Sequence, residues 1–229
     1  MIKFTYSSYN ELPISLEDDD VHLYVIENKI SAERNNSLTN ILKSYGLENT
    51  CNYFNNRTVY GKPFLSSEVN QKGIEFNLSH TQNICLLGIT LHKRIGVDIE
   101  YRRFLLLDKD FLKNILTNKE QEYLARFAHD SQKSLYTFYH YWTRKEALLK
   151  GIGEGLQFGL KNIELDLSST KLNAYKIESD HPLDYLWSVA SFELKDSHVV
   201  AFAIKGKFSR VHIIMEPSQN QGSHFPKNI

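Results

Sequence analysis

The central part of the chain, residues 104–150, has the apolar spacing of a helical region and lies between two regions that have the pattern of strands. We expect one break in it near 116–118, where Thr117 and Glu120 have the spacing of a capping box, and a last helix that begins after Asp130. Strand-like alternation or short apolar runs are found at 2–6, 21–27, 74–78, 84–91, 94–100, 162–167, 172–177, 185–194, 199–204 and 211–215. This order of elements predicts an α+β fold.

The two strand-rich regions share an order of elements. A helix expected over 31–45 is followed by strands at 84–91 and 95–99, and the last helix is followed by strands at 199–204 and 211–215. The resemblance rests on pattern alone, and it predicts two similar α+β halves related by a pseudo-two-fold, with the active site in the cleft between them. The predicted boundaries are 1–105 for the first half, 106–215 for the second half and 216–229 for a flexible tail.

The composition is that of a globular protein, with 41% hydrophobic and 24% charged residues. The formal net charge is zero, so general electrostatic binding to nucleic acid is not indicated. Cys51 and Cys85 lack metal-site spacing, and neither a signal peptide nor a membrane-spanning apolar run is found. We therefore expect a cytoplasmic protein that binds neither a membrane nor nucleic acid. The acidic run Glu17–Asp20 is expected to be a solvated loop.

The end of the central helical region carries a charged pair. Glu146 and Lys150 are four residues apart, so both leave one helical face. On spacing alone this is an ordinary surface ion pair, which contributes roughly a few tenths of a kcal/mol. The stretch Gly96–Glu100 offers a second interpretation, because alternation in a strand puts Asp98 and Glu100 on one face. Those two carboxylates also suit an exposed strand face, but together with Glu146 they indicate a shared site.

Three converging carboxylates repel one another. At 4 Å each pair costs about 1 kcal/mol in water and about 4 kcal/mol at an effective dielectric constant of 20. A divalent cation removes this cost, and oxygen ligands without His or Cys favour Mg²⁺ or Mn²⁺ over zinc. We therefore expect Asp98, Glu100 and Glu146 to bind Mg²⁺, or alternatively Mn²⁺, with substrate phosphate completing the coordination.

Four further residues are candidate phosphate ligands. Ser79 and His80 offer hydroxyl and imidazole donors at the end of a strand. Lys62 lies in a Gly-Lys-Pro turn, where glycine allows close backbone approach and proline stiffens the bend. Lys145 points elsewhere on the helix, toward another phosphate oxygen or solvent. In isolation, His80 also suits a surface or structural histidine and Lys62 a solvated lysine.

Four motifs occur in order along the chain: Gly61–Pro63, Phe76–His80, Gly96–Glu100 and Trp142–Gly151. Each motif is short, but their order and gaps closely resemble those of the 4′-phosphopantetheinyl transferases of the long, Sfp-like type. The resemblance covers about residues 20–205.

The resemblance implies a monomer that binds coenzyme A and Mg²⁺ between its two halves. Such a protein moves the phosphopantetheine arm of coenzyme A onto a serine of an acyl or peptidyl carrier protein and releases adenosine 3′,5′-bisphosphate. By this resemblance Asp98, Glu100 and Glu146 bind the metal, and Lys150 contacts the reacting phosphate. Either Glu146 or a metal-bound water takes the serine proton, and the sequence leaves both alternatives open.

The resemblance also implies that Lys62 and His80 hold the phosphates of coenzyme A, with Ser79 beside them and Lys145 as a further candidate. This chain departs from the family pattern in two places. The first helix has only two cations where the family commonly has an arginine-rich helix, and the second proline after Gly-Lys-Pro is replaced by Phe64. The first departure concerns recognition of the 3′-phosphate, and neither affects the metal motif.

Two alternatives to a transferase are considered. A non-catalytic relative would bind coenzyme A or carrier protein without transfer, but the full carboxylate set and Lys150 argue against loss of activity. A Mg²⁺-dependent nucleotide hydrolase would need a phosphate-binding glycine motif, which is absent. Because carrier proteins are usually acidic, Lys109, Lys113 and Lys119 are predicted to form a docking patch.

Overall fold

The computed structural model describes residues 3–8, 15–27, 31–47, 56–58, 61–66, 68–82, 84–153, 159–167, 173–176, 186–194 and 198–215. The predicted flexible tail, 216–229, lies outside these residues. In chain order the elements are β1 (Lys3–Ser8), β2 (Asp20–Glu27), α1 (Ser31–Ser44), β3 (Ile74–Thr81), β4 (Ile84–Leu91), β5 (Ile95–Tyr101), α2 (Lys109–Ile115), α3 (Asn118–Ala125), α4 (Ser131–Ile152), the 3₁₀ helix η4 (Leu160–Asn162), β6 (Asn173–Lys176), β7 (Leu186–Leu194), β8 (His198–Lys205) and β9 (Arg210–Met215).

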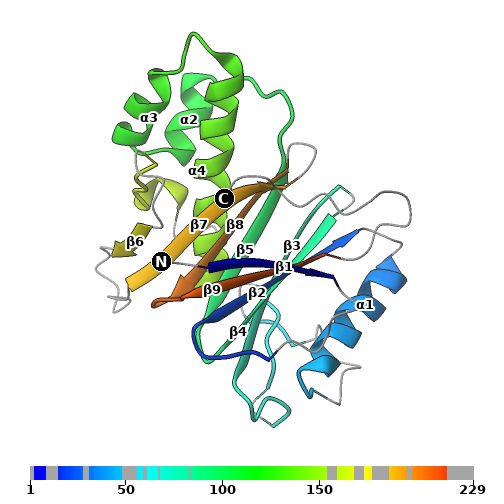
Figure 1. The fold of residues 1–229 in the computed structure, drawn as a ribbon. Coiled ribbons are helices and arrows are strands. Elements are labelled where there is room, and N and C mark those ends of the chain that lie inside the picture. Colours follow the sequence, from blue (N-terminus) through cyan, green and yellow to red (C-terminus); the bar gives the residue numbers. More distant parts are fainter. Residues whose placement is uncertain are drawn as a thin grey trace.

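The strands form two sheets, with helices on the outer side of each (Figure 1). The strand order is β1-β9-β2-β4-β3 in the first sheet and β5-β8-β7-β6 in the second. Helix α1 packs on the first sheet and α4 on the second, and a third apolar core fills the space between the sheets. The α+β class is therefore confirmed. None of the described helices is both long and apolar enough to cross a membrane.

The chain changes sheet before two of its strands, β5 and β9. Strand β5 follows β4 in the chain but pairs antiparallel with β8, with Asp98 opposite Ala201. Strand β9 follows β8 but lies between β1 and β2, parallel to both. Each region predicted as a half thus gives its closing strand to the other sheet. The pseudo-two-fold and the predicted boundaries remain predictions.

The two sheets also meet edge to edge along β3 and β5, and side chains join them there. Val97 N donates to Asn77 Oδ1 at 2.9 Å, and Ile99 N donates to Ser79 Oγ at 3.4 Å. These polar side chains accept bonds from backbone N–H groups at the edge of β5 that would otherwise lack a partner, so the two sheets stay separate. This seam carries one of the predicted motifs, because Asn77 and Ser79 alternate along β3.

Helix α4 rests directly on the backbone of β5. A Cβ added to Gly96 would lie 2.0 Å from the carbonyl oxygen of Ala147 and 2.2 Å from the nitrogen of Gly151. A Cβ added to Gly151 would lie 2.7 Å from the Trp187 ring. Only glycine permits this approach, so the two glycines determine how close the helix and the strand come.

The predicted helix boundaries within the central region are largely confirmed. Helix α2 ends before the predicted break, and Thr117 forms the expected capping box with Glu120 at the start of α3. The Asp130 carboxylate accepts a bond from Lys133 N and caps α4. Gly153, with φ of 81°, ends α4 in the left-handed conformation.

Two predicted elements are wrong. Residues 104–108 are not helical, because α2 begins only after Asp108, whose carboxylate accepts a bond from Phe111 N at 2.8 Å. Residues 163–167 alternate between buried and exposed positions but form no strand. There Leu165 N donates to Glu120 Oε1 at 2.7 Å, so a side chain takes the place of a neighbouring strand.

Candidate active site

Strand β5 presents its carboxylates to α4. Val97 and Ile99 pack between the sheets, so Asp98 and Glu100 leave the other face of the strand, as the alternation predicts. Asp98 is buried, and Glu100 is partly buried at the end of β5. The Trp142 indole of α4 donates to Glu100 Oε1 at 3.3 Å. Both carboxylates therefore lie at the contact between β5 and α4.

Helix α4 adds the lysine and the third carboxylate. Lys150 Nζ donates to Asp98 Oδ1 at 2.6 Å and to Ser79 Oγ at 2.9 Å, and Ser79 Oγ donates to the same Asp98 oxygen at 2.9 Å. The close approach at Gly96 places this part of the helix over the strand. Three predicted site residues, Ser79, Asp98 and Lys150, thus form one hydrogen-bonded cluster at the seam between the sheets.

Asp98 and the two carboxylates beside it, Glu100 and Glu146, carry more negative charge than Lys150 neutralises. Burial raises the pKa of Glu146 to about 7; Asp98 and Glu100 raise it further and Lys150 opposes the rise. Burial and then Asp98 also raise the pKa of Glu100. These shifts arise because each carboxylate loses water and faces another negative charge.

Asp98 has one carboxylate oxygen that no described residue satisfies. Oδ1 accepts bonds from Ser79 and Lys150, whereas Oδ2 is buried without a hydrogen-bond partner. An unsatisfied buried oxygen beside two further carboxylates suits a hard divalent cation, which prefers oxygen ligands. The residues present therefore fit Mg²⁺. The three carboxylates do not meet within 4.8 Å as Asp20, His22 and His212 do elsewhere in the described chain, so a bound ion would draw them closer.

Lys145 does not lie at this cluster. It is fully buried, and its ammonium donates to Glu120 Oε2 at 2.5 Å and to the carbonyl oxygens of Ile115 and Leu160 at 2.8 and 3.1 Å. All three of its donors are used inside the protein. The predicted contact of Lys145 with coenzyme A remains a prediction that this geometry does not support, because the step of one residue from Glu146 turns the side chain by about 100°, here into the core.

Lys62 lies at the carboxyl end of α4. Its ammonium donates to the carbonyl oxygens of Ile95 at 3.1 Å and Gly151 at 3.5 Å, and Arg94 donates to the carbonyl oxygen of Ile152. Burial lowers the pKa of Lys62 to about 8, against the attraction of Glu75. Two cations thus cap the negative end of the helix that carries Lys150. No pattern in the sequence indicated Arg94 at this position.

His80 lies next to the cluster along the chain but is exposed. It follows Ser79 on β3, so it leaves the opposite face of the strand, and its register partner on β4 is Cys85. The structure therefore brings Ser79 to the carboxylates and Lys150, but not His80.

A cavity of about 370 Å³ opens beside Glu100. Its wall is largely aromatic, and Trp142 joins it to the carboxylates through the bond to Glu100. The lining residues are Thr81, Gln82, Glu100, Tyr101, Arg103, Leu105, Phe111, Phe138, Tyr139 and Trp142. This cavity was not predicted, because residues 104–108 were expected to be helical, whereas they form a loop whose Leu105 lines the cavity.

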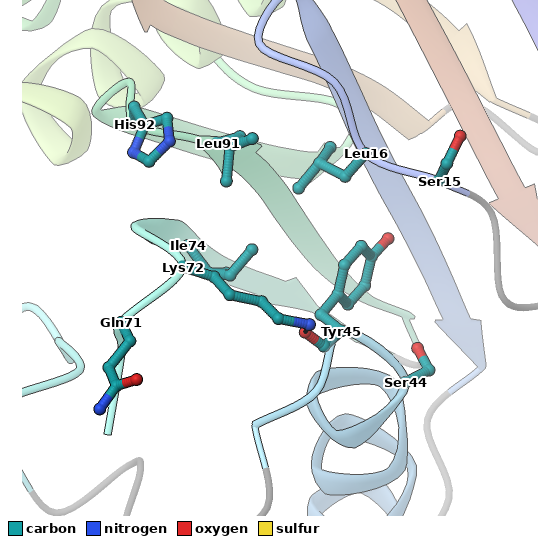
Figure 2. Close-up of a pocket in the computed structure, with 9 residues that line it drawn as sticks. All are labelled: Ser15, Leu16, Ser44, Tyr45, Gln71, Lys72, Ile74, Leu91 and His92. Atoms are coloured by element: carbon teal, nitrogen blue, oxygen red, sulfur yellow. Dashed lines mark hydrogen bonds between the residues drawn. The ribbon is translucent and has the colours of Figure 1, made fainter. Parts of the chain in front are cut away.

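A second cavity, of about 560 Å³, lies at the start of β3, at the end of the strand opposite to His80 (Figure 2). Figure 2 shows Lys72 reaching toward Tyr45, whose carbonyl oxygen accepts a bond from its ammonium at 3.0 Å. No carboxylate is among the nine lining residues that Figure 2 draws. This cavity therefore lacks the groups that phosphate chemistry with Mg²⁺ requires.

Comparison with known proteins agrees with this geometry. A sequence model of the 4′-phosphopantetheinyl transferase superfamily matches residues 94–203. This range includes the three carboxylates and Lys150, but not Lys62, Ser79 or His80.

Several curated proteins are similar to the chain. The 4′-phosphopantetheinyl transferase HetI of Nostoc is 34% identical over 146 residues, which cover 64% of this chain and 58% of HetI. The human L-aminoadipate-semialdehyde dehydrogenase-phosphopantetheinyl transferase is 30% identical over 162 residues, covering 65% and 52% of the two chains. The 4′-phosphopantetheinyl transferase gsp of Aneurinibacillus migulanus is 31% identical over 124 residues, covering 54% and 48%. The match thus spans about half the length of these relatives.

Proposed function

The chain belongs to the 4′-phosphopantetheinyl transferase superfamily, and we propose that it transfers the phosphopantetheine arm of coenzyme A to a serine of an acyl or peptidyl carrier protein. The observation that carries the proposal is the cluster of Ser79, Asp98 and Lys150, with Glu100 and Glu146 beside it. It combines an excess of carboxylates with an ammonium group, which suits a polyphosphate held through a divalent cation.

In the proposed reaction the serine Oγ of the carrier protein attacks the β-phosphorus of coenzyme A. The bond from that phosphorus to the bridging oxygen breaks, and adenosine 3′,5′-bisphosphate leaves. Lys150 stabilises negative charge on the reacting phosphate through its ammonium group. Mg²⁺, bound by Asp98, Glu100 and Glu146, would supply further charge neutralisation at the pyrophosphate.

Glu146 is the side chain best suited to accept the serine proton. In the metal-free chain its pKa of about 7 matches the pH at which general bases are most effective, and a cation bound to the carboxylate would lower that pKa. The neighbouring Lys150 holds the opposite charge on the same helical face. Glu146 therefore serves as base directly, or through a water molecule when it binds the cation.

The aromatic cavity beside Glu100 is the proposed site of the pantetheine arm. Its volume of about 370 Å³ suits a flexible chain of that size, and its polar residues, among them Gln82 and Arg103, suit the amide groups of the arm. Next to it, the loop before α2 exposes Phe104 by 80% and Leu106 by 72%. Large apolar side chains that are exposed in a loop lining the cavity suit a docking protein.

Of the predicted docking lysines, two lie on α2 directly after this loop. Lys109 and Lys113 are exposed, and Lys113 forms a solvated pair with Asp110 at 3.3 Å. Lys119 is further away on α3 and pairs with Glu164 at 2.8 Å. We therefore place the acidic partner over the loop and α2, with Lys119 at its margin.

Transfer is tested by intact-mass measurement. The purified chain is incubated with coenzyme A, Mg²⁺ and a panel of apo-carrier proteins, and one phosphopantetheine should be added to the carrier serine. EDTA should stop the reaction, and a carrier with its serine changed to alanine should not react. If coenzyme A binds but no carrier in the panel gains mass, the chain is a binding protein rather than a transferase.

A further inference from the structure

A pair of histidines lies side by side on neighbouring strands, far in sequence from the carboxylate cluster. His22 of β2 and His212 of β9 are register partners, and their ring centroids are 4.8 Å apart with the planes at 71°. Asp20 precedes His22 by two residues and so leaves the same face of β2. One ligand atom of each of the three side chains lies within 4.8 Å of the other two.

Each imidazole is held by a hydroxyl group through one ring nitrogen. Nδ1 of His22 lies 2.6 Å from Tyr45 Oη, and Nδ1 of His212 lies 2.6 Å from Thr5 Oγ1. Histidine ligands of metals almost always make such a bond with the ring nitrogen that does not bind the metal, because it fixes the tautomer and the ring orientation. With the Nδ1 proton donated to the hydroxyl, the lone pair of each ring is on Nε2.

The free nitrogen of His22 has no partner in the described structure. His22 is fully buried, and its Nε2 makes no hydrogen bond. Leaving a buried polar atom unsatisfied costs about 1–3 kcal/mol. A ligand at this nitrogen would remove that cost.

Asp20 retains acceptor capacity toward the histidines. Arg210 Nε donates to its Oδ1 at 2.6 Å, while Arg210 Nη2 and Glu17 N each donate to Oδ2 at 3.1 Å. A carboxylate has about four acceptor positions, so one on Oδ1 remains. Asp20 is thus a buried residue at the start of β2, and the prediction that it belongs to a solvated acidic loop is wrong for this position.

We propose that Asp20, His22 and His212 bind one divalent transition-metal ion, with Zn²⁺ the best match to the donor set. Two imidazole nitrogens and one carboxylate oxygen are ligands that zinc prefers, whereas Mg²⁺ prefers oxygen alone. A water molecule completes the coordination. The ion joins β2 to β9 and, through Thr5, orders β1 as well, so the site stabilises the first sheet. The proposal is independent of the transferase function.

Charges near the site determine its affinity for a metal ion. Arg210 and Lys3 are the cations that face the histidines, and both oppose a metal ion. Glu17, which also pairs with Arg210, offsets part of that charge. His212 is only partly buried, so the ion reaches the site from its side. We therefore expect binding weaker than in a fully negative site, but specific for metals that bind imidazole.

The test uses the full chain carrying Asp98→Asn, which weakens binding of metal at the active-site carboxylates. After treatment with a chelator, the protein is titrated with Co²⁺ and followed by visible absorption, and with Zn²⁺ in a calorimeter. One equivalent should bind, the Co²⁺ spectrum should report nitrogen ligands, and Zn²⁺ should raise the unfolding temperature. The same protein with His212→Gln should bind at least tenfold more weakly.

The matched control is His129→Gln, which removes an exposed histidine that belongs to no cluster described here and should leave binding unchanged. Circular dichroism checks that each variant is folded, and His22→Asn provides a second disruption if His212→Gln is not. The proposal is overturned if the folded parent binds no equivalent of Zn²⁺, or if both histidine variants bind as tightly as the parent.

Discussion

Helix α4 carries two lysines that both pair with a carboxylate, and the two pairs differ in how completely they are satisfied. Lys145 and Glu120 are 0% and 1% exposed, and their polar atoms meet partners from several elements. Lys150 is 32% exposed, and its partner Asp98 has a buried oxygen without a partner. The first pair is a closed structural network, and the second is open to a ligand.

The difference lies in charge balance as well as hydrogen bonding. One lysine meets one carboxylate in the Lys145 pair, whereas Lys150 faces three carboxylates. Burial lowers the pKa of Lys145 and raises that of Glu120, despite their mutual attraction. A buried pair of this kind gives little net stability, but the loss of one partner is costly. Incomplete satisfaction of hydrogen bonds, rather than burial or pairing, therefore distinguishes the lysine that we propose to be functional.

The largest effect is expected for Lys145→Met. It leaves the Glu120 carboxylate buried without its cation and should lower the free energy of unfolding by roughly 3–5 kcal/mol. Urea unfolding followed by circular dichroism measures this. Adding Glu120→Gln should recover part of the loss, because the buried charge is removed. A stable Lys145→Met protein with weakened coenzyme A binding would instead restore Lys145 as a phosphate ligand.

Asp98→Asn tests the open cluster, that is, Lys150 with the carboxylates of Asp98, Glu100 and Glu146. The amide keeps the size of the side chain but loses the charge that binds the cation, so transfer should fall by about 100- to 1,000-fold. The unfolding free energy should change little or rise, because repulsion among the carboxylates is relieved. Turnover at saturating Mg²⁺, measured by intact mass, is the readout. Near-normal turnover would remove Asp98 from the site.

Glu146 gives the open cluster a pH dependence. Its pKa of about 7 exceeds the ordinary 4.5, so the folded metal-free chain binds more protons than the unfolded chain between these values. Its contribution to the unfolding free energy therefore decreases as the pH rises through this window. Glu146→Gln removes the titration and should be about 2 kcal/mol more stable than the parent at pH 8, once solvent screening is allowed for.

The two proteins should be nearly equal in stability at about pH 3, well below the ordinary pKa of 4.5, where the parent carboxyl is neutral in both states. Urea unfolding in EDTA at each pH measures the difference. Glu122→Gln, at an exposed position on α3, is the control and should show no such pH dependence. A Glu146→Gln protein that is less stable than the parent at pH 8 would mean that the carboxylate makes favourable contacts.

The smallest effect is expected for His80→Ala, because His80 belongs to neither of the two lysine–carboxylate pairs compared above. As a contact to coenzyme A phosphate in the ground state, its loss should raise KM for coenzyme A by about tenfold and leave kcat unchanged. Lys150→Ala is the contrasting variant and should mainly lower kcat. A strong fall in kcat with unchanged KM for His80→Ala would give this exposed histidine a part in the reaction itself.

The residues that sequence periodicity governs were predictable. Alternation in β5 placed Asp98 and Glu100 on one face, and helical spacing placed Glu146 with Lys150. Lys145 was not predictable in this way, because its surroundings depend on α3 and on the segment after α4, which pack against it only in the folded chain. Local pattern sets the direction of a side chain but not what the rest of the fold brings to it.

The same limit applies to the seam between the sheets. The strand predicted from the sequence pattern ends at residue 78, whereas β3 continues to Thr81. The side chains of Asn77 and Ser79 in β3 bond to the backbone of β5. A polar residue in a strand faces solvent or another edge depending on which strand lies beside it. That neighbour is set by the exchange of strands, which no local pattern encodes.

The exchange of β5 has a consequence for how the protein is made. Strand β5, which carries Asp98 and Glu100, pairs in its sheet with β8, and roughly a hundred residues separate the two strands. At a synthesis rate of about 5–20 residues per second, β5 waits on the order of 5–20 s for that partner. Strand β1 waits longer still, because in the described chain it pairs with β9 alone. During this interval the nascent chain exposes open strand edges, so the speed of the ribosome and the presence of chaperones bear directly on the yield of active protein.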